Sequence, residues 1–148
     1  MTQAAPIRAT PIRVFLVDDQ TLVRQGIRSL LALAEGIDVV AEACDGRQAV
    51  EQIPQVAPDV VLMDMRMPVM SGLESLQAMS RAGTLPPTII LTTFDDDALV
   101  LAGIKAGAKG YLLKDVSLEQ LVNAIQMVAA GGSLVQPAVT QRLLSGLE

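Results

Sequence analysis

The sequence predicts an α/β fold, a doubly wound parallel sheet of the (βα)5 type in which five strands alternate with five helices. The first observation is a series of short apolar runs rich in Val, Ile and Leu, which suit strands buried on both faces. The second is that the segments between these runs are longer and have apolar residues at helical spacing. Parallel strands need crossover connections, and right-handed crossovers place helices on both faces of the sheet.

The first two strands and the helix between them are expected before residue 44. Strands are predicted at Ile12 to Val17 and at Ile37 to Ala43, because both runs are rich in β-branched residues. A helix is predicted from Leu22 to Glu35, with Gly36 as its stop signal. Its apolar face consists of Val23, Ile27, Leu30, Leu31 and Ala34.

The middle of the chain predicts a helix, a strand and a second helix. Asp45 and Gly46 open a short helix whose apolar residues are Ala49, Val50 and Ile53. The run from Val60 to Met63 is the third strand, and Pro68 to Gly72 is a loop. The next helix ends at Gly83, and its apolar stripe consists of Leu73, Leu76 and Met79.

The last third of the chain repeats the pattern twice. Thr88 to Thr92 and Gly110 to Leu113 are predicted strands. Asp95 to Asp97 cap and charge the start of a helix that runs to about Gly107, where acids suit the macrodipole. The final helix begins with a capping box of Ser117 and Gln120 and ends at Gly131 and Gly132; its apolar face consists of Leu118, Leu121, Val122, Ile125 and Val128.

These elements define one folded domain, expected at about residues 11–132. Residues 1–10 are predicted to be a flexible leader. Residues 133–148 are expected to form a linker or the start of a C-terminal element.

Composition excludes several classes of function. The chain has 148 residues, a net charge of −5 and a pI near 4.6, which argue against binding to nucleic acid phosphates. Because the chain has no histidine, serine–histidine hydrolysis and histidine-ligated zinc are excluded on this chain. Its one cysteine, Cys44, cannot form an intrachain disulfide and is expected to be buried. No apolar stretch approaches the ~18 residues of a membrane span, so we expect a cytoplasmic protein with no membrane partner.

Acidic residues stand where predicted strands end. Asp64 closes the third strand, and Asp18 and Asp19 follow the first. Thr92 and Lys114 come at the ends of the fourth and fifth strands. In open α/β sheets the carboxyl ends of the strands share one edge, where ligands bind. Carboxylates there suit Mg²⁺, and an aspartate beside the metal can attack phosphorus, while a hydroxyl and an ammonium bind the phosphoryl oxygens.

Each of these residues also has a purely structural interpretation. Asp18 and Asp19 could cap the helix that begins near Gln20. Thr92 suits a strand, and Lys114 could extend along apolar surface to solvent. Asp64 resists such an interpretation, because an acid that closes a buried strand requires a partner.

The ordered set Asp18–Asp19, Asp64 with Pro68 and Gly72, Thr92 and Lys114 resembles the receiver domain of two-component response regulators. The resemblance spans Ile12 to Gly132. The segments 91–96 (LTTFDD) and 110–115 (GYLLKD) are most similar to the NarL/FixJ (LuxR-type) group. The resemblance implies a flavodoxin-like (CheY-like) fold with strand order 2-1-3-4-5.

The same resemblance implies a role for each residue. Asp64 would accept a phosphoryl group from a sensor histidine kinase, and Lys114 would pair with Asp64 before phosphorylation and with the phosphoryl group afterwards. Thr92 would move toward the phosphoryl group, followed inward by Tyr111. The implied ligands of Mg²⁺ are Asp19, Asp64 and the backbone carbonyl of Arg66, with Asp18 acting mainly through water.

The resemblance also implies partners. The domain would be a switch rather than an enzyme, although it would assist its own phosphotransfer and dephosphorylation. It would form a phosphorylation-dependent homodimer through the fourth helix, fifth strand and fifth helix, or through the first and fifth helices. Transcription would be regulated through a C-terminal helix-turn-helix DNA-binding domain, which is not expected within this chain.

Three other functions compete. A Mg²⁺-dependent phosphatase of the haloacid-dehalogenase type would carry Asp-x-Asp after the first strand, whereas Asp64-Met65-Arg66 lacks the second acid and lies on the third. A nucleotide- or flavin-binding domain is disfavoured, because neither Gly-x-Gly-x-x-Gly nor a Walker pattern is present. A pseudo-receiver, an interaction module that phosphorylation does not control, remains the alternative, although all five acceptor-site residues are present.

Overall fold

The structure is a computed structural model that describes residues 10–92 and 97–135. Most of the predicted leader, two of the predicted capping residues (Asp95 and Asp96) and residues 136–148 therefore lie outside the described part. Within that part, no helix is both long and apolar enough to cross a membrane.

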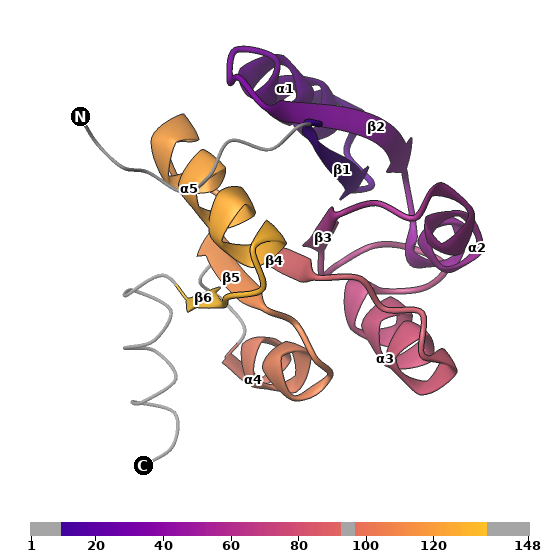
Figure 1. The fold of residues 1–148 in the computed structure, drawn as a ribbon. Coiled ribbons are helices and arrows are strands. Elements are labelled where there is room, and N and C mark those ends of the chain that lie inside the picture. The colour runs from indigo at the N-terminus through magenta and orange to yellow at the C-terminus, as the bar shows by residue number, and fades with distance from the viewer. Residues whose placement is uncertain (1–9, 93–96, 136–148) are drawn as a thin grey trace.

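The structure contains one sheet of six parallel strands in the order β2-β1-β3-β4-β5-β6, so the expected order 2-1-3-4-5 is confirmed. The strands are β1 (Ile12–Val17), β2 (Ile37–Ala43), β3 (Val60–Asp64), β4 (Thr88–Thr92), β5 (Gly110–Leu113) and β6 (Leu134–Val135). The short β6 was not predicted. It lies beside β5 at the edge of the sheet (Figure 1). There the Leu134 N–H donates to the Lys109 carbonyl at 2.9 Å.

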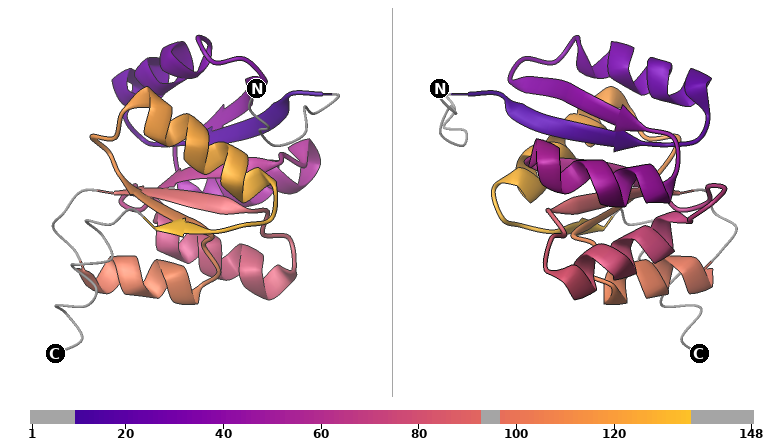
Figure 2. Two further views of the ribbon diagram at one scale, coloured as in Figure 1. Left: turned by 60° about the vertical axis from the view of Figure 1, so that its left-hand side comes forward. Right: turned by 90° about the vertical axis from the view of Figure 1, so that its right-hand side faces the viewer.

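Helices cover both faces of the sheet, as Figures 1 and 2 show. The helices are α1 (Thr21–Leu31), α2 (Gly46–Val56), α3 (Gly72–Ala82), α4 (Asp97–Lys105) and α5 (Leu118–Ala129). Helices α1 and α5 lie on one face, and α2, α3 and α4 lie on the other. This is the doubly wound architecture that the alternating pattern predicts.

Alternation along the strands directs core side chains to the two faces of the sheet. Val14 and Leu16 of β1 pack under α1 and α5, whereas Phe15 and Val17 pack under α2. A third cluster under α3 and α4 contains Tyr111 of β5, whose side chain is completely buried. Because the central strands are buried on both faces, their sequences are continuously apolar.

Helix ends follow the sequence signals with one correction. Both Ser71 at α3 and Ser117 at α5 form complete capping boxes. Helix α1 ends at Leu31 rather than at Glu35. The next N–H groups, of Leu33 and Ala34, bond to the carbonyls three residues earlier, at 3.1 and 3.0 Å. This tighter turn keeps Ala34 on the apolar face, so the helical period continues past the end of the helix.

The pairing of β1 and β2 contains a β-bulge. Val14 pairs with Val39, but Phe15 pairs with Ala41, so the register shifts by one residue of β2. Beyond the shift, Glu42 lies opposite Leu16. Partners in a parallel ladder point to the same face, so the bulge directs Glu42 toward α1.

Candidate functional site

Three carboxylates meet at the carboxyl edge of the sheet. Asp18 and Asp19 directly follow β1, and Asp64 ends the neighbouring strand β3. Each of the three can offer one carboxylate oxygen such that all three oxygens lie within 4.8 Å of one another. Asp18 and Asp64 are buried, whereas Asp19 is exposed.

Lys114 joins this cluster from the end of β5. Its Nζ lies 3.3 Å from Asp18 Oδ2 and 3.2 Å from Asp64 Oδ1. Its backbone N–H donates to the Thr92 carbonyl at 2.8 Å, which continues the β4–β5 ladder past the strand ends. The ammonium therefore lies between two buried acids rather than extending freely to solvent.

The charges in this cluster are not fully balanced. Burial, together with the nearby charge of Asp18, raises the pKa of Asp64 above its usual value, and Lys114 only partly offsets this. Burial acts to lower the pKa of Lys114, but Asp64 and Asp18 outweigh it, so that this pKa is raised. Two buried acids share one lysine, so binding of a further cation would be favourable.

Among the residues that the structure describes, the Asp18 carboxylate has partners, whereas the Asp19 carboxylate has none. Asp18 Oδ1 accepts the Gln20 N–H at 2.9 Å, and its Oδ2 faces Lys114. The N-cap of α1 is Gln20, which makes no side-chain capping bond, so Asp18 and Asp19 do not cap this helix. Within the described residues, no hydrogen bond or ion pair engages the Asp19 carboxylate.

The turn after Asp64 depends on a close approach by α3. A Cβ on Gly72 would lie 2.2 Å from the Asp64 carbonyl oxygen, a distance that backbone cannot accommodate. The Gly72 N–H donates to the Met65 carbonyl at 2.9 Å. The N–H of Arg66 points at Asp64 Oδ1, although at a long 3.5 Å. Gly72 therefore allows the chain to turn tightly beneath the acceptor residue.

The other two predicted site residues lie on neighbouring strands. Thr92 ends β4 one residue beyond Leu91, the partner of Asp64 in the ladder, and is buried. Tyr111 lies on β5, three residues before Lys114, with its ring in the cluster under α4. Gly103 of α4 makes this packing possible, since a Cβ there would lie 3.4 Å from Tyr111 Cε2 and 2.6 Å from Ile90 Cδ1.

The donor set is suitable for a hard divalent cation. Mg²⁺ is bound through carboxylate oxygens, usually one or two, together with waters. Asp19 offers an exposed carboxylate, and Asp64 has a raised pKa that a cation would lower. The residues present therefore fit the implied magnesium, although the position of the Arg66 carbonyl stays a prediction.

One contact at this edge was not anticipated. Arg24, on α1, donates from its guanidinium to the Asp18 carbonyl. The pattern of polar residues at strand ends does not indicate Arg24, because Arg24 lies inside a helix. The available signal was Glu42, an acid between Ala41 and Ala43 near the end of β2, which required a partner.

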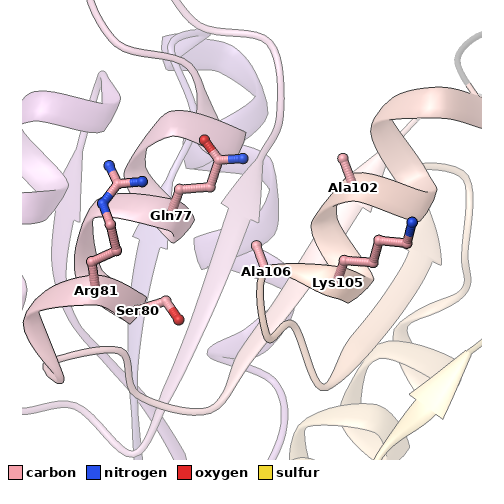
Figure 3. Close-up of a pocket in the computed structure, with 6 residues that line it drawn as sticks. All are labelled: Gln77, Ser80, Arg81, Ala102, Lys105 and Ala106. Carbon is pink, nitrogen blue, oxygen red and sulfur yellow. The ribbon is translucent and has the colours of Figure 1, made fainter.

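A separate groove of about 330 Å³ lies between α3 and α4 (Figure 3). Its lining residues are Gln77, Ser80, Arg81, Ala102, Lys105 and Ala106. None of the acids at the sheet edge lines it, so this groove is not part of the candidate site.

Comparison with known proteins assigns the family. The family described as the response regulator receiver domain matches residues 14–126. "Transcriptional regulatory protein LnrK" of Bacillus subtilis (strain 168) is 41% identical over 134 residues, which cover 90% of this chain and 61% of that protein. "Nitrate/nitrite response regulator protein NarP" of Escherichia coli (strain K12) is 46% identical over 135 residues, covering 91% and 63%. The chain thus spans about three fifths of the length of these relatives.

Solved structures agree. A LuxR-family two-component response regulator from Aurantimonas sp. SI85-9A1 superposes with a TM-score of 0.85 at 32% identity, covering 93% of this chain and 99% of that one. The signal receiver domain of the putative response regulator NarL from Mycobacterium tuberculosis gives a TM-score of 0.76 at 37% identity, covering 82% and 98%. The chain therefore belongs to the response regulator receiver domain family.

Proposed function

We propose that this domain is a switch controlled by phosphorylation of Asp64, and that the phosphoryl group comes from a phosphohistidine of a sensor kinase. One observation carries the proposal. Asp64 is a buried acid at the sheet edge whose carboxylate lies beside a lysine and two further acids. A purely structural acid would not need a second buried acid, Asp18, which makes its ionisation harder.

The proposed transfer makes one bond and breaks one bond. An oxygen of ionised Asp64 attacks phosphorus, the phosphorus–nitrogen bond of the donor phosphohistidine breaks, and the electron pair leaves with the imidazole nitrogen. Bound Mg²⁺ would neutralise charge on the transferring phosphoryl oxygens. Asp18, Asp19, Asp64 and the Arg66 carbonyl are the proposed groups that hold the cation.

Lys114 has two tasks in this scheme. Before transfer, its Nζ lies 3.2 Å from Asp64 Oδ1, and the positive charge favours the ionised, nucleophilic form of Asp64. After transfer, it can pair with a phosphoryl oxygen instead. The domain is a signalling module rather than an enzyme, but the same groups would also assist hydrolysis of the acyl phosphate by water.

The signal would be read through β4, β5 and α4. Thr92 ends β4 next to Lys114, and its hydroxyl is the proposed ligand of the phosphoryl group. Movement of Thr92 would favour one packing of Tyr111 against α4, because both side chains lie at neighbouring strands of one sheet. The result is a shift between two populations of the surface formed by α4, β5 and α5.

A homodimer and a separate output domain complete the proposal. Helix α1 and the turn after it expose Leu22, Leu30 and Leu33, which supports a dimer surface on the α1–α5 side. The curated relatives are longer than the matched region, so we assign DNA binding and transcriptional control to a further C-terminal domain. We place the phosphotransfer in the cytoplasm, where the kinase is phosphorylated by ATP.

Binding of beryllofluoride, a phosphoryl mimic, tests the proposal. Tyr111 is the only tyrosine and there is no tryptophan, so intrinsic fluorescence reports directly on the switch residue. We expect beryllofluoride with Mg²⁺ to change this fluorescence, and neither component alone to do so. Asp64→Asn should abolish the response, and no response in the parent domain would favour a pseudo-receiver.

A further inference from the structure

Arg24 connects α1 to the backbone of the acidic cluster. Its guanidinium donates to the Asp18 carbonyl at 2.5 Å and to Thr21 Oγ1 at 3.3 Å. Its Nε pairs with Glu42 Oε1 of β2 at 3.1 Å. Only 15% of the Arg24 side chain is exposed. A planar, nearly buried guanidinium with partners in the β1–α1 link, in β2 and on its own helix has little freedom to move.

The partners of Arg24 are themselves fixed. The β-bulge in the β1–β2 pairing directs Glu42 toward α1. Arg28, one helical turn after Arg24, contacts the other carboxylate oxygen of Glu42. Glu42 is therefore held from two positions on α1, and it fixes the direction in which Arg24 points.

This contact acts on the link between β1 and α1, where two acids of the cluster lie. The link contains only Asp18, Asp19 and Gln20. Asp18 is held at its N–H by the Ala43 carbonyl at 3.2 Å and at its carboxylate by Gln20 and Lys114. Arg24 holds the remaining group, the Asp18 carbonyl, which belongs to the peptide plane leading to Asp19. Asp19 itself has no partner within the described residues.

We propose that Arg24 is a positioning residue for the metal site: through the Asp18 carbonyl it fixes the peptide that places the Asp19 carboxylate beside Asp18 and Asp64. Arg24 does not touch the metal or the phosphoryl group. The inference rests on the proposed function, because it assumes that Asp19 ligates the cation.

Mg²⁺ affinity of the unphosphorylated domain, measured by isothermal titration calorimetry, tests this proposal. Arg24→Met retains the apolar stem of the side chain and removes the guanidinium. We expect it to weaken Mg²⁺ binding about tenfold, the usual effect of removing a group that orients a metal ligand. Arg24→Lys keeps the charge beside Glu42 but cannot hold both partners with a fork, so its affinity should be intermediate.

Arg13→Met is the matched control. Arg13 donates to the Val56 and Ala57 carbonyls, at 3.0 and 2.8 Å, and so also stabilises backbone, but at the C-terminus of α2. Its variant should lose stability in urea yet bind Mg²⁺ within twofold of the parent. A second measurement on metal-free protein, the amide resonances of Asp19 and Gln20, should change in Arg24→Met and not in Arg13→Met.

Parent-like Mg²⁺ affinity in Arg24→Met would overturn the proposal, as would equal weakening in both variants. A parent domain that binds no Mg²⁺ would overturn it as well. The proposed function fails by a different result, absence of phosphorylation at Asp64, which acetyl phosphate labelling of the same proteins measures separately.

Discussion

At the scale of residues, the site is defined by an imbalance of charge. Asp18 and Asp64 are both buried and share Lys114, so that two negative charges face one positive charge within a few ångströms. The imbalance lowers the stability of the empty site, and it increases the benefit of a bound cation. The same burial and nearby acid that make ionised Asp64 costly in the folded domain would favour a bound cation there.

Asp64→Asn is therefore expected to stabilise the metal-free domain at neutral pH, by roughly 1 kcal/mol, a typical single-residue effect. The folded-state pKa of Asp64 is raised, so folding is favoured most below the ordinary carboxyl pKa and loses stability as pH rises through the folded value. Asp64→Asn removes this loss. Urea denaturation between acidic and neutral pH, without Mg²⁺, measures the difference. Asp38→Asn, at an exposed position of β2, should leave the parent profile unchanged.

Lys114→Met should have the opposite effect. Removing the ammonium leaves two buried carboxylates without their shared cation, and we expect a loss of roughly 1–3 kcal/mol at neutral pH. The loss should shrink in acid as Asp64 takes up a proton. In the parent, the raised pKa of Lys114 means that its contribution is complete below the ordinary lysine pKa and disappears only at strongly alkaline pH. Equal stability of parent and variant across this range would contradict the assigned ion pairs.

At the scale of elements, the site depends on how strands and helices end. Strand carboxyl ends bring Asp18, Asp64 and Lys114 together, which is why sequence patterns alone could place them at one edge. The contacts of Arg24 could not be predicted, because they depend on the β-bulge that orients Glu42, and a bulge leaves no periodic signal in β2. The end of α1 was predicted too late because its last turn preserves the apolar spacing. The strand β6 has only two residues, too few to show a period.

Substitutions at two glycines distinguish a glycine that is required by close packing of the backbone from one that only lowers helix stability. Gly72→Ala should destabilise the domain by about 1–3 kcal/mol, because its Cβ would collide with the Asp64 backbone and displace α3. Gly26 lies inside α1 with open space around its Cβ position, so Gly26→Ala should stabilise by about 0.5–1 kcal/mol. Chemical denaturation measures both. A neutral Gly72→Ala would show that the approach of α3 to β3 is looser than described.

At the scale of the whole molecule, the proposed switch requires that one added phosphoryl group change how the domain associates. The described surface exposes Leu22 and Leu33 at 80% and 75%, both on the side covered by α1 and α5. The proposed dimer surface includes both leucines.

Leu33→Glu should reduce dimerisation in the presence of beryllofluoride and Mg²⁺, because a charge would be buried at the contact. Sedimentation velocity should show a dimer for the parent and a monomer for the variant at the same concentration. Gln77→Glu adds the same charge to the exposed face of α3 and should dimerise as the parent does. A dimeric Leu33→Glu protein would move the association surface away from α1.

Phosphorylation of Asp64 itself is the most direct test of the account. The domain would be incubated with acetyl phosphate and Mg²⁺, followed by intact-mass measurement and mapping of the modified peptide. The expected result is the gain of one phosphoryl group on the peptide that contains Asp64, lost when Mg²⁺ is chelated and absent in Asp64→Asn. An unmodified parent protein, or modification that persists in Asp64→Asn, would contradict the assignment of Asp64 as phosphoacceptor.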